Sequence, residues 1–276
     1  ANGTICGVKF NDLNGNGVKD AGEPGLSNWT IQVKYANGTV AATATTDATG
    51  SYCVTLPAAL TPAIYVGDAS NHRIRKYDLN GNFITKWGSY GTGDGQFNSQ
   101  LGIAVDSSGY VYVADYGNHR IQKFDSNGNF ITKWGSYGTG NGQFHLPYDV
   151  AIDSSDYVYV ADTINHRIQK FNSTGGYTTQ WGSQGTGNGQ LNVPTGVIVD
   201  SSGYVYVTEG GNNRIQKFDS NGNFITKWGS YGTGDGQFSY PTDVAVDSSG
   251  NVYVVDNNNN RIQKFDSNGN FITKWG

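Results

Sequence analysis

A polar loop near the start of the chain has the residue types and spacing of a calcium-binding loop. In the stretch DLNGNGVKDAGE, residues 12–23, side chains with oxygen atoms stand at loop positions 1, 3, 5, 9 and 12, and a glycine stands at position 6. This spacing lets a short loop surround Ca²⁺ with carboxylate, amide and carbonyl oxygens. A polar surface loop is the alternative, but such loops do not usually place five oxygens and a glycine in register, so we predict a Ca²⁺ site. The expected ligands are Asp12, Asn14, Asn16, the carbonyl of Val18, Asp20 and a bidentate Glu23.

Further along the chain, an acidic residue stands five positions before an arginine in each copy of a repeat. The pairs are Asp68 and Arg73, Asp115 and Arg120, Asp162 and Arg167, Glu209 and Arg214, and Asp256 and Arg261. These groups could form a ring of acids and bases, or each pair could join the two ends of one hairpin by an ion pair. Because all five copies keep the pair, we favour the structural role.

Three histidines share another position of the repeat. His72, His119 and His166 occupy it in the first three copies, and Asn213 and Asn260 follow in the last two. Three imidazoles could hold a metal ion, but equivalent positions on successive repeat units should lie farther apart than metal ligands do. We therefore expect no metal site there.

No arrangement in the sequence indicates catalysis. The GTGDG and GTGNG loops lack the following Lys-Ser or Lys-Thr and the helix that a phosphate-binding loop needs, so we interpret them as linkers with positive φ angles. No serine, cysteine or lysine has a recognisable base partner. The sequence therefore predicts that the protein is not an enzyme.

The repeat that carries the acid–arginine pairs has a period of 47 residues, marked by Trp87, Trp134, Trp181, Trp228 and Trp275. A period of this size is typical of a propeller or a solenoid. One copy reads as four short strands, at residues 102–106, 110–114, 119–125 and 129–134, with turn residues between them. Such a sheet cannot bury both faces alone, so we expect an all-β fold in which each sheet packs against its neighbours.

The recurring motifs resemble the NHL repeat over about residues 64–276. They are NHRIRKY at Asn71, NHRIQKF at Asn118 and Asn165, and NNRIQKF at Asn212 and Asn259. The resemblance implies a β-propeller, usually of six blades, that serves mostly as a binding or scaffolding platform and occasionally as a metal-dependent lyase. This chain has five copies, so we expect about five four-stranded blades. The first copy has LPAALTP where the others have a strand such as IAVD, so the first blade should lack its innermost strand.

The missing strand should leave an unpaired edge near the centre of the propeller. Residues 51–62 could fill it, or a strand of another copy could join it by β-augmentation. A closed ring of five blades that tolerates the defect is the third alternative.

The first 62 residues differ from the repeat. Strands are expected at residues 4–10, 29–35, 39–46 and 51–56, which indicates a small β-sandwich. GVKFNDLNGNGVKDAGEPGLSNWTIQV followed by TTDATGSYCVTL resembles the serine-aspartate-repeat B-type domain over about residues 3–56. That resemblance implies a calcium-binding sandwich of the kind found in cell-surface adhesins. We therefore divide the chain into domains at residues 1–62 and 63–276.

The two cysteines, Cys6 and Cys53, lie in the first and last of these strands, which are neighbours in a sandwich of this kind. We expect a disulfide between them, with free buried thiols as the alternative; a pair of cysteines and no methionine favours an oxidising compartment.

The sequence contains no apolar run of about 20 residues, so we expect no transmembrane segment. It begins with Ala1, which fits a mature protein after removal of a signal peptide. We expect an extracellular or cell-surface location on a bacterium or archaeon. The net charge of −4 argues against nucleic acid as a partner.

Two classes of function fit these features. The first is a structural component of a cell surface, such as a subunit of a filament, sheath or surface layer, that self-associates into a homopolymer or joins other surface proteins. The second is a recognition platform whose propeller face binds a glycan, peptide or protein. Tyr90, Tyr137 and Tyr231, in the links between blades, are the expected interaction surface in either case.

Removing calcium tests the predicted metal loop. Chelation should lower the melting temperature of the first domain and leave the propeller transition nearly unchanged, because a ligand stabilises only the unit that binds it. Differential scanning calorimetry with and without excess chelator measures both transitions. An identical melt in the two conditions would refute the calcium site.

Overall fold

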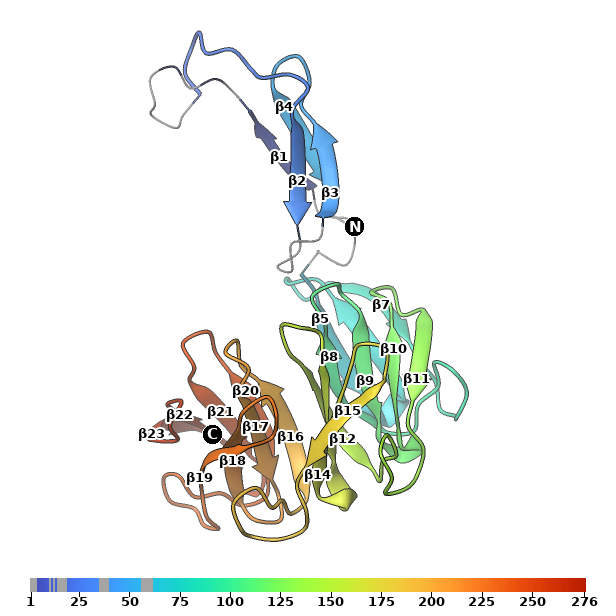
Figure 1. Ribbon diagram of the computed structural model, residues 1–276, viewed down its shortest axis with the longest axis vertical. Coiled ribbons are helices and arrows are strands. Elements are labelled where there is room, and N and C mark those ends of the chain that lie inside the picture. Colours follow the sequence, from blue (N-terminus) through green and yellow to red (C-terminus); the bar gives the residue numbers. More distant parts are fainter. Residues whose placement is uncertain (1–3, 10, 12, 14–18, 35–39, 56–61) are drawn as a thin grey trace. The chain divides into compact units, whose positions relative to one another are not determined.

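The computed structural model describes residues 4–9, 11, 13, 19–34, 40–55 and 62–276 (Figure 1). The chain forms two compact units. One consists of Ala1–Ala63 with Ser107–Gly109, and the other of Ile64–Asp106 with Tyr110–Gly276.

The first unit contains two antiparallel strand pairs. Strand β1 (Thr4–Val8) pairs with β4 (Ser51–Thr55), and β2 (Thr30–Lys34) pairs with β3 (Val40–Thr45). The register of β1 and β4 places Cys6 opposite Cys53. The structure does not describe the side chain of Cys6, so the disulfide between Cys6 and Cys53 stays a prediction.

The second unit is a β-propeller of five antiparallel sheets, which confirms the predicted fold class. Blade 1 consists of β5 (Ile64–Asp68), β6 (Arg73–Tyr77) and β7 (Phe83–Trp87). Blade 2 consists of β8 (Gln100–Val105), β9 (Val111–Asp115), β10 (Arg120–Phe124) and β11 (Phe130–Trp134). Blade 3 consists of β12 (Pro147–Ile152), β13 (Val158–Asp162), β14 (Arg167–Phe171) and β15 (Tyr177–Trp181).

The last two blades repeat this order. Blade 4 consists of β16 (Pro194–Val199), β17 (Val205–Glu209), β18 (Arg214–Phe218) and β19 (Phe224–Trp228). Blade 5 consists of β20 (Pro241–Val246), β21 (Val252–Asp256), β22 (Arg261–Phe265) and β23 (Phe271–Trp275). Among the described residues, blade 1 has three strands in the order β5-β6-β7, without the innermost strand of the other blades, as predicted.

Four hydrophobic clusters hold the blades together, and each lies between consecutive blades. The cluster between blades 3 and 4 contains Ile168 and Trp181 from one blade and Val205, Val207 and Phe218 from the next. These residue types follow from the strand pattern, because alternate side chains of each strand point to one face of the sheet. Among the described residues no such cluster joins blade 5 to blade 1.

A glycine in the outer turn of one blade receives the tryptophan of the preceding blade. Gly175 has a φ of +88°, and a Cβ at this position would lie 2.7 Å from atoms of the Trp134 ring. The turn therefore requires glycine for its backbone conformation and for the approach of the ring.

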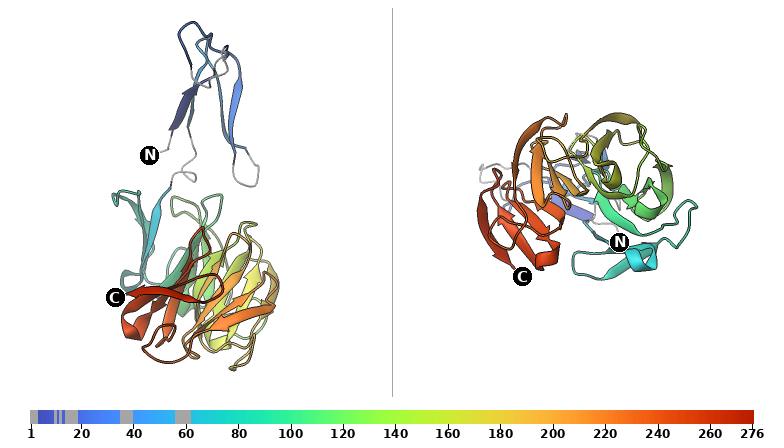
Figure 2. Two further views of the ribbon diagram at one scale, coloured as in Figure 1. Left: turned by 90° about the vertical axis from the view of Figure 1, so that its left-hand side faces the viewer. Right: turned by 90° about the horizontal axis from the view of Figure 1, so that it is seen from below.

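The first and last blades each have one face that no other blade covers. Figure 2 shows the five blades around a common centre, with blade 1 and blade 5 on the two sides of an opening. Ile262 of blade 5 is partly exposed, whereas Ile168 at the same repeat position is fully buried. On blade 1, Ile64 and Val66 are exposed, whereas the equivalent valines of the other blades are buried.

Matched isoleucine truncations test this difference in burial. Ile168→Ala should lower the free energy of unfolding by about 2–5 kcal/mol, because it leaves a cavity between two blades. Ile262→Ala removes the same atoms from a partly solvated face and should cost clearly less. Urea unfolding of both variants measures the difference. Equal losses would mean that another surface covers Ile262 in solution.

Candidate functional site

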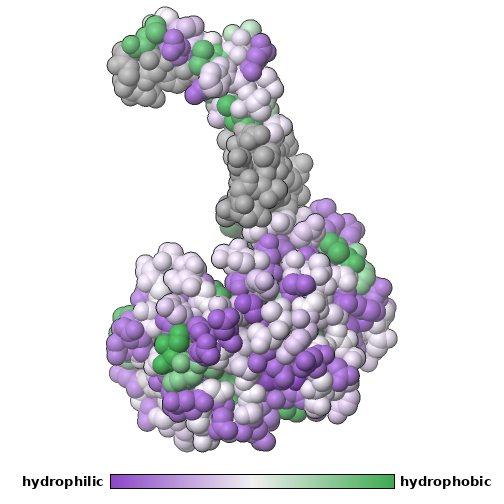
Figure 3. Space-filling model, viewed as in Figure 1, coloured by the Kyte–Doolittle hydropathy of each residue, from purple (hydrophilic) through white to green (hydrophobic). Residues whose placement is uncertain are grey.

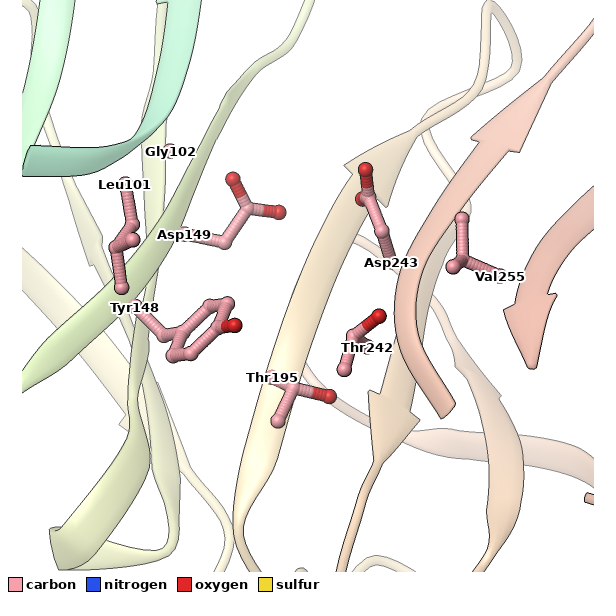
Figure 4. A pocket seen from close by; sticks show the side chains of 8 residues that line it. All are labelled: Leu101, Gly102, Tyr148, Asp149, Thr195, Thr242, Asp243 and Val255. Carbon is pink, nitrogen blue, oxygen red and sulfur yellow. The ribbon is translucent and has the colours of Figure 1, made fainter. Parts of the chain in front are cut away.

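The innermost strands of blades 2 to 5 bring one repeat position to the centre of the propeller. Gly102, Asp149, Gly196 and Asp243 occupy this position on β8, β12, β16 and β20. A cavity of about 300 Å³ opens beside these strands (Figure 4). Its lining residues are Leu101, Gly102, Tyr148, Asp149, Thr195, Thr242, Asp243 and Val255.

The alternation of glycine and aspartate at this position makes room for the carboxylates. A Cβ at Gly102 would collide with the Asp149 carboxylate, and a Cβ at Gly196 would lie 3.0 Å from Cα of Asp243. Contacts closer than about 3 Å force neighbouring atoms to move. The carboxylate of Asp149 therefore requires glycine at position 102, and the backbone of Asp243 requires a small residue at position 196.

Backbone amides hold Asp149 in a fixed orientation. Its Oδ1 accepts a hydrogen bond from Val150 N at 2.8 Å, and its Oδ2 accepts one from Val197 N at 2.9 Å. Burial, followed by the negative charge of Asp243, raises the pKa of Asp149 to about 7. The two backbone hydrogen bonds act in the opposite direction, because they favour the charged form.

Asp243 faces Asp149 across the cavity (Figure 4). Its Oδ1 accepts a hydrogen bond from Val244 N at 2.7 Å, and burial raises its pKa above the usual range. With its pKa raised to about 7, Asp149 can accept or donate a proton near neutral pH. Hydroxyl groups of Tyr148 and Thr242 also line this space. The cavity therefore contains polar groups that can bind a polar ligand.

The cavity offers two carboxylates, and the described residues contain no group of three or more His, Cys, Asp or Glu side chains that could hold a metal ion. The site residues that we predicted from the sequence lie outside this cavity.

Four of the acid–arginine pairs join a hairpin to the linker that precedes it. Arg120 Nε lies 2.7 Å from Asp115 Oδ2, and the same guanidinium donates to the carbonyls of Thr92, Gly93 and Gln96. The pairs of Arg167, Arg214 and Arg261 with Asp162, Glu209 and Asp256 have the same arrangement. The pair of Arg73 with Asp68 is more exposed. This geometry supports the structural role that we favoured.

The shared histidine position also serves as a link between blades. His119 has a φ of +55°, and its Nδ1 accepts a hydrogen bond from Leu146 N at 3.0 Å. His72 and His166 accept equivalent bonds from Ser99 N and Val193 N. In the fourth copy Asn213 Oδ1 accepts from Tyr240 N at 2.8 Å, so asparagine replaces histidine as an acceptor that tolerates a positive φ.

The linker tyrosines Tyr90, Tyr137 and Tyr231 are all well exposed and do not line the central cavity. Tyr137 packs against the rings of His119 and His145. The three residues remain a proposed interaction surface.

Most of the predicted calcium loop falls outside the described residues. Asp12, Asn14, Asn16 and Val18 are in this group, whereas Asp20 and Glu23 are described. The carboxylate oxygens of Glu23 accept hydrogen bonds from Leu13 N at 2.9 Å and from Asp20 N at 3.0 Å, and the residue is buried. Backbone amides thus orient both carboxylate oxygens of Glu23, the residue that the sequence predicts as a bidentate ligand.

Sequence reasoning missed the two central aspartates, although a signal was present. The copies read LGIAVD, YDVAID, TGVIVD and TDVAVD in this region, so glycine and aspartate alternate at the second position, before three apolar residues and a constant aspartate. A departure from the repeat at one inner position was the available clue.

The fold is a β-propeller, and the residues that line its centre differ from one blade to the next. Family models match an SdrD B-like domain at residues 3–69 and NHL repeats at residues 101–124, 144–171, 191–218 and 238–265. The chain therefore combines an SdrD B-like domain, a module of cell-surface proteins, with an NHL-repeat propeller. No curated protein matches the chain.

Solved structures with a similar fold include three enzymes. A catalytically inactive virginiamycin B lyase from Staphylococcus aureus with quinupristin is 13% identical with a TM-score of 0.58, covering 97% of this chain and 88% of that one. A streptogramin B lyase is 13% identical with a TM-score of 0.59, covering 99% and 87%. A gluconolactonase from Xanthomonas campestris is 14% identical with a TM-score of 0.55, covering 77% and 71%.

These structures contradict the prediction that the protein is not an enzyme, because enzymes use this propeller fold. The sequence argument considered only motifs and base partners along the chain, and this premise was wrong. A propeller brings the same position of several blades into one central space, so a few substitutions can create an asymmetric site there. At 12–14% identity the likeness concerns the fold.

The coupling between the central carboxyls can be tested by Asp243→Asn. This change removes a negative charge next to Asp149 and should lower the pKa of Asp149 from about 7, while burial keeps it above the usual value for aspartate. Carboxyl-carbon NMR titration measures the shift, and Asp219→Asn on an exposed outer turn serves as the control.

The raised pKa also fixes the direction of a stability effect. As the pH rises from about 4 to about 7, the unfolded chain loses this proton before the folded chain does, so the contribution of Asp149 to stability is lost. Asp243→Asn should reduce that loss. An unchanged pKa of Asp149 in the variant would show that the two carboxyls do not interact.

Proposed function

We propose that this protein is an extracellular structural protein of the cell surface. Its propeller would bind other copies of the chain or other surface proteins. The module composition supports this role: an SdrD B-like domain is typical of cell-surface proteins, and NHL propellers often mediate protein interactions. No helix in the described ranges has the length and apolar character to cross a membrane.

The observation that carries the proposal is the open arrangement of the blades. In the part of the chain that the structure describes, five blades have four intervening hydrophobic clusters, and blade 1 has three strands where the others have four. A repeat stack buries its core only where neighbours meet, so its terminal faces need a cap or a partner. In this propeller both terminal faces carry exposed apolar side chains, including Val66 and Trp275. Self-association into a filament, sheath or surface layer would cover them.

The N-terminal unit would serve as a rigid surface module in this assembly. Ca²⁺ bound by the 12–23 loop would hold that loop, with Glu23 as a ligand already oriented by two backbone amides. A disulfide between Cys6 and Cys53, which face each other in the β1–β4 register, would join the first and last strands. Both features suit an extracellular protein.

The central cavity supports a second candidate, a recognition platform for a glycan or peptide. It presents two carboxylates and several hydroxyl groups in one space of about 300 Å³. A glycan or peptide array should then show saturable binding to the monomer that Asp243→Asn weakens. Binding that the variant leaves unchanged would exclude the cavity as the binding site.

The assembly role can be tested on the 276-residue chain with calcium present. Sedimentation velocity and light scattering over a hundredfold range of concentration should show growth from monomer to polymers, because covering the terminal faces removes apolar surface from water. Negative-stain imaging should then show filaments or sheets. A monomer at every concentration would overturn the structural role and favour the recognition platform.

A further inference from the structure

A pocket on blade 4 is lined by two basic residues and by no acidic one. Its volume is about 410 Å³, a size that suits a small ligand. Arg214, Lys227, Trp228 and Tyr231 are among the lining residues, and none of these lines the central cavity. The whole chain has a net charge of −4, so the local excess of basic residues sets this pocket apart.

Lys227 lacks the acidic partner that its equivalents have. In blade 2, Lys133 Nζ lies 2.6 Å from Asp94 Oδ1, and the equivalent pair of blade 5 has a distance of 2.7 Å. In the linker before blade 4, the position of this acid is occupied by Asn188. Lys227 Nζ lies 3.5 Å from the carbonyl oxygen of Thr186, and no carboxylate in the described part of the chain forms an ion pair with it. Its ammonium group can therefore bind an anion.

Arg214 offers a second donor in the same pocket. In blade 3, Nη1 of Arg167 donates one hydrogen bond to a linker carbonyl and a second to Oε1 of Gln180 at 2.7 Å. Lys227 takes the position of this glutamine in blade 4, and a lysine ammonium accepts no hydrogen bond. Nη1 of Arg214 donates to the carbonyl of Thr186 at 2.6 Å. Among the described residues, its other N–H has no acceptor and is left for a ligand.

The ring of Tyr231 is more open than the rings of its equivalents. Tyr90 and Tyr137 each contact the histidine at the shared repeat position, with ring centroids 4.9 and 5.2 Å apart. Asn213 replaces this histidine in the fourth copy, and the described residues provide no ring contact for Tyr231. Tyr231 is 75% exposed. It therefore presents a flat apolar surface in the pocket that contains the two basic groups.

We propose that this pocket binds a uronic acid residue of an acidic glycan. The sugar carboxylate would accept hydrogen bonds from Lys227 Nζ and Arg214 Nη1, because charge-assisted bonds to carboxylates are stronger than neutral ones. The apolar face of the sugar ring would lie on the ring of Tyr231, which combines apolar area with a polar hydroxyl. A glycan fits this pocket better than an acidic peptide, since aspartate and glutamate have no flat face to cover the tyrosine.

This site goes beyond the proposed assembly role. It shares the class of ligand with the second candidate function, but it places the glycan on blade 4 and not in the central cavity. Polymer formation and sugar binding at this pocket are measured separately, so one can fail while the other holds.

Calorimetric titration of the 276-residue chain with tetragalacturonate tests the site. The sugar should bind saturably, and the affinity should fall as salt is added, because ions screen exposed charges. The methyl ester of the same sugar has no carboxylate and should bind at least tenfold more weakly. Equal affinities for the acid and the ester would overturn the carboxylate contact.

Two substitutions remove the free charge by residues that other copies of the repeat use. Lys227→Gln should accept from the arginine as the glutamine of blade 3 does, and Asn188→Asp should pair with the lysine as the acids of blades 2 and 5 do. Each should weaken tetragalacturonate binding at least tenfold. Lys133→Gln is the matched control, because Asp94 already holds that lysine, and it should leave the affinity unchanged.

Tyr231→Gln tests the aromatic surface. Gln184 occupies the equivalent position in the third copy, so the change suits the fold, and it should also weaken binding at least tenfold. Thermal melts verify that every variant is folded. An unchanged affinity would overturn the stacking of the sugar on this ring.

Three further results would overturn the site. The first is a chain that does not bind tetragalacturonate. The second is an equal loss with Lys133→Gln and Lys227→Gln, which would show a general attraction to surface lysines. The third is tighter binding of tetraglutamate than of the sugar, which would assign the pocket to an acidic peptide.

Discussion

The stacking of one sheet face on the next is the interaction on which this propeller depends. No blade is thick enough to bury its own apolar side chains, so each core forms only between two blades. Burying one isoleucine or phenylalanine side chain stabilises a fold by about 1.5–3 kcal/mol. Since every interface repeats the same residues, the stability of the stack is close to a sum over neighbouring pairs.

A polar network gives each interface a defined geometry. Apolar faces alone would allow two blades to slide, whereas the guanidinium of Arg167 is tied to Asp162 and to the linker carbonyls of Thr139, Gly140 and Gln143. The pair is buried, and a buried charge that loses its partner is strongly destabilising. The acid and the arginine therefore have to be kept together in every copy, which accounts for their recurrence.

The same repetition creates a place for variation at the centre. Outer positions of a blade meet only the neighbouring blade, but the innermost strands of several blades share one space. The substitution of aspartate for glycine at two of four equivalent positions is enough to put two interacting carboxyls there. Propellers can for this reason combine a constant scaffold with a variable centre, as the lyases and the gluconolactonase of similar fold illustrate.

The sequence by itself determined the all-β class, the 47-residue blade, the number of blades and the missing strand of blade 1. These features are local: strand alternation, turn residues and the period of Trp and Ile are written into each copy, and the lost strand is visible as LPAALTP in the place of IAVD. The structural role of the acid–arginine pairs could also be argued from their recurrence. Only the tertiary structure decided where Asp149 and Asp243 meet, since 94 residues of chain separate them and an interior site depends on which strands converge. It also decided that Trp275 is 47% exposed whereas its four equivalents pack between blades, because packing between blades is a property of their arrangement in space. Figure 3 shows apolar residues on the propeller surface.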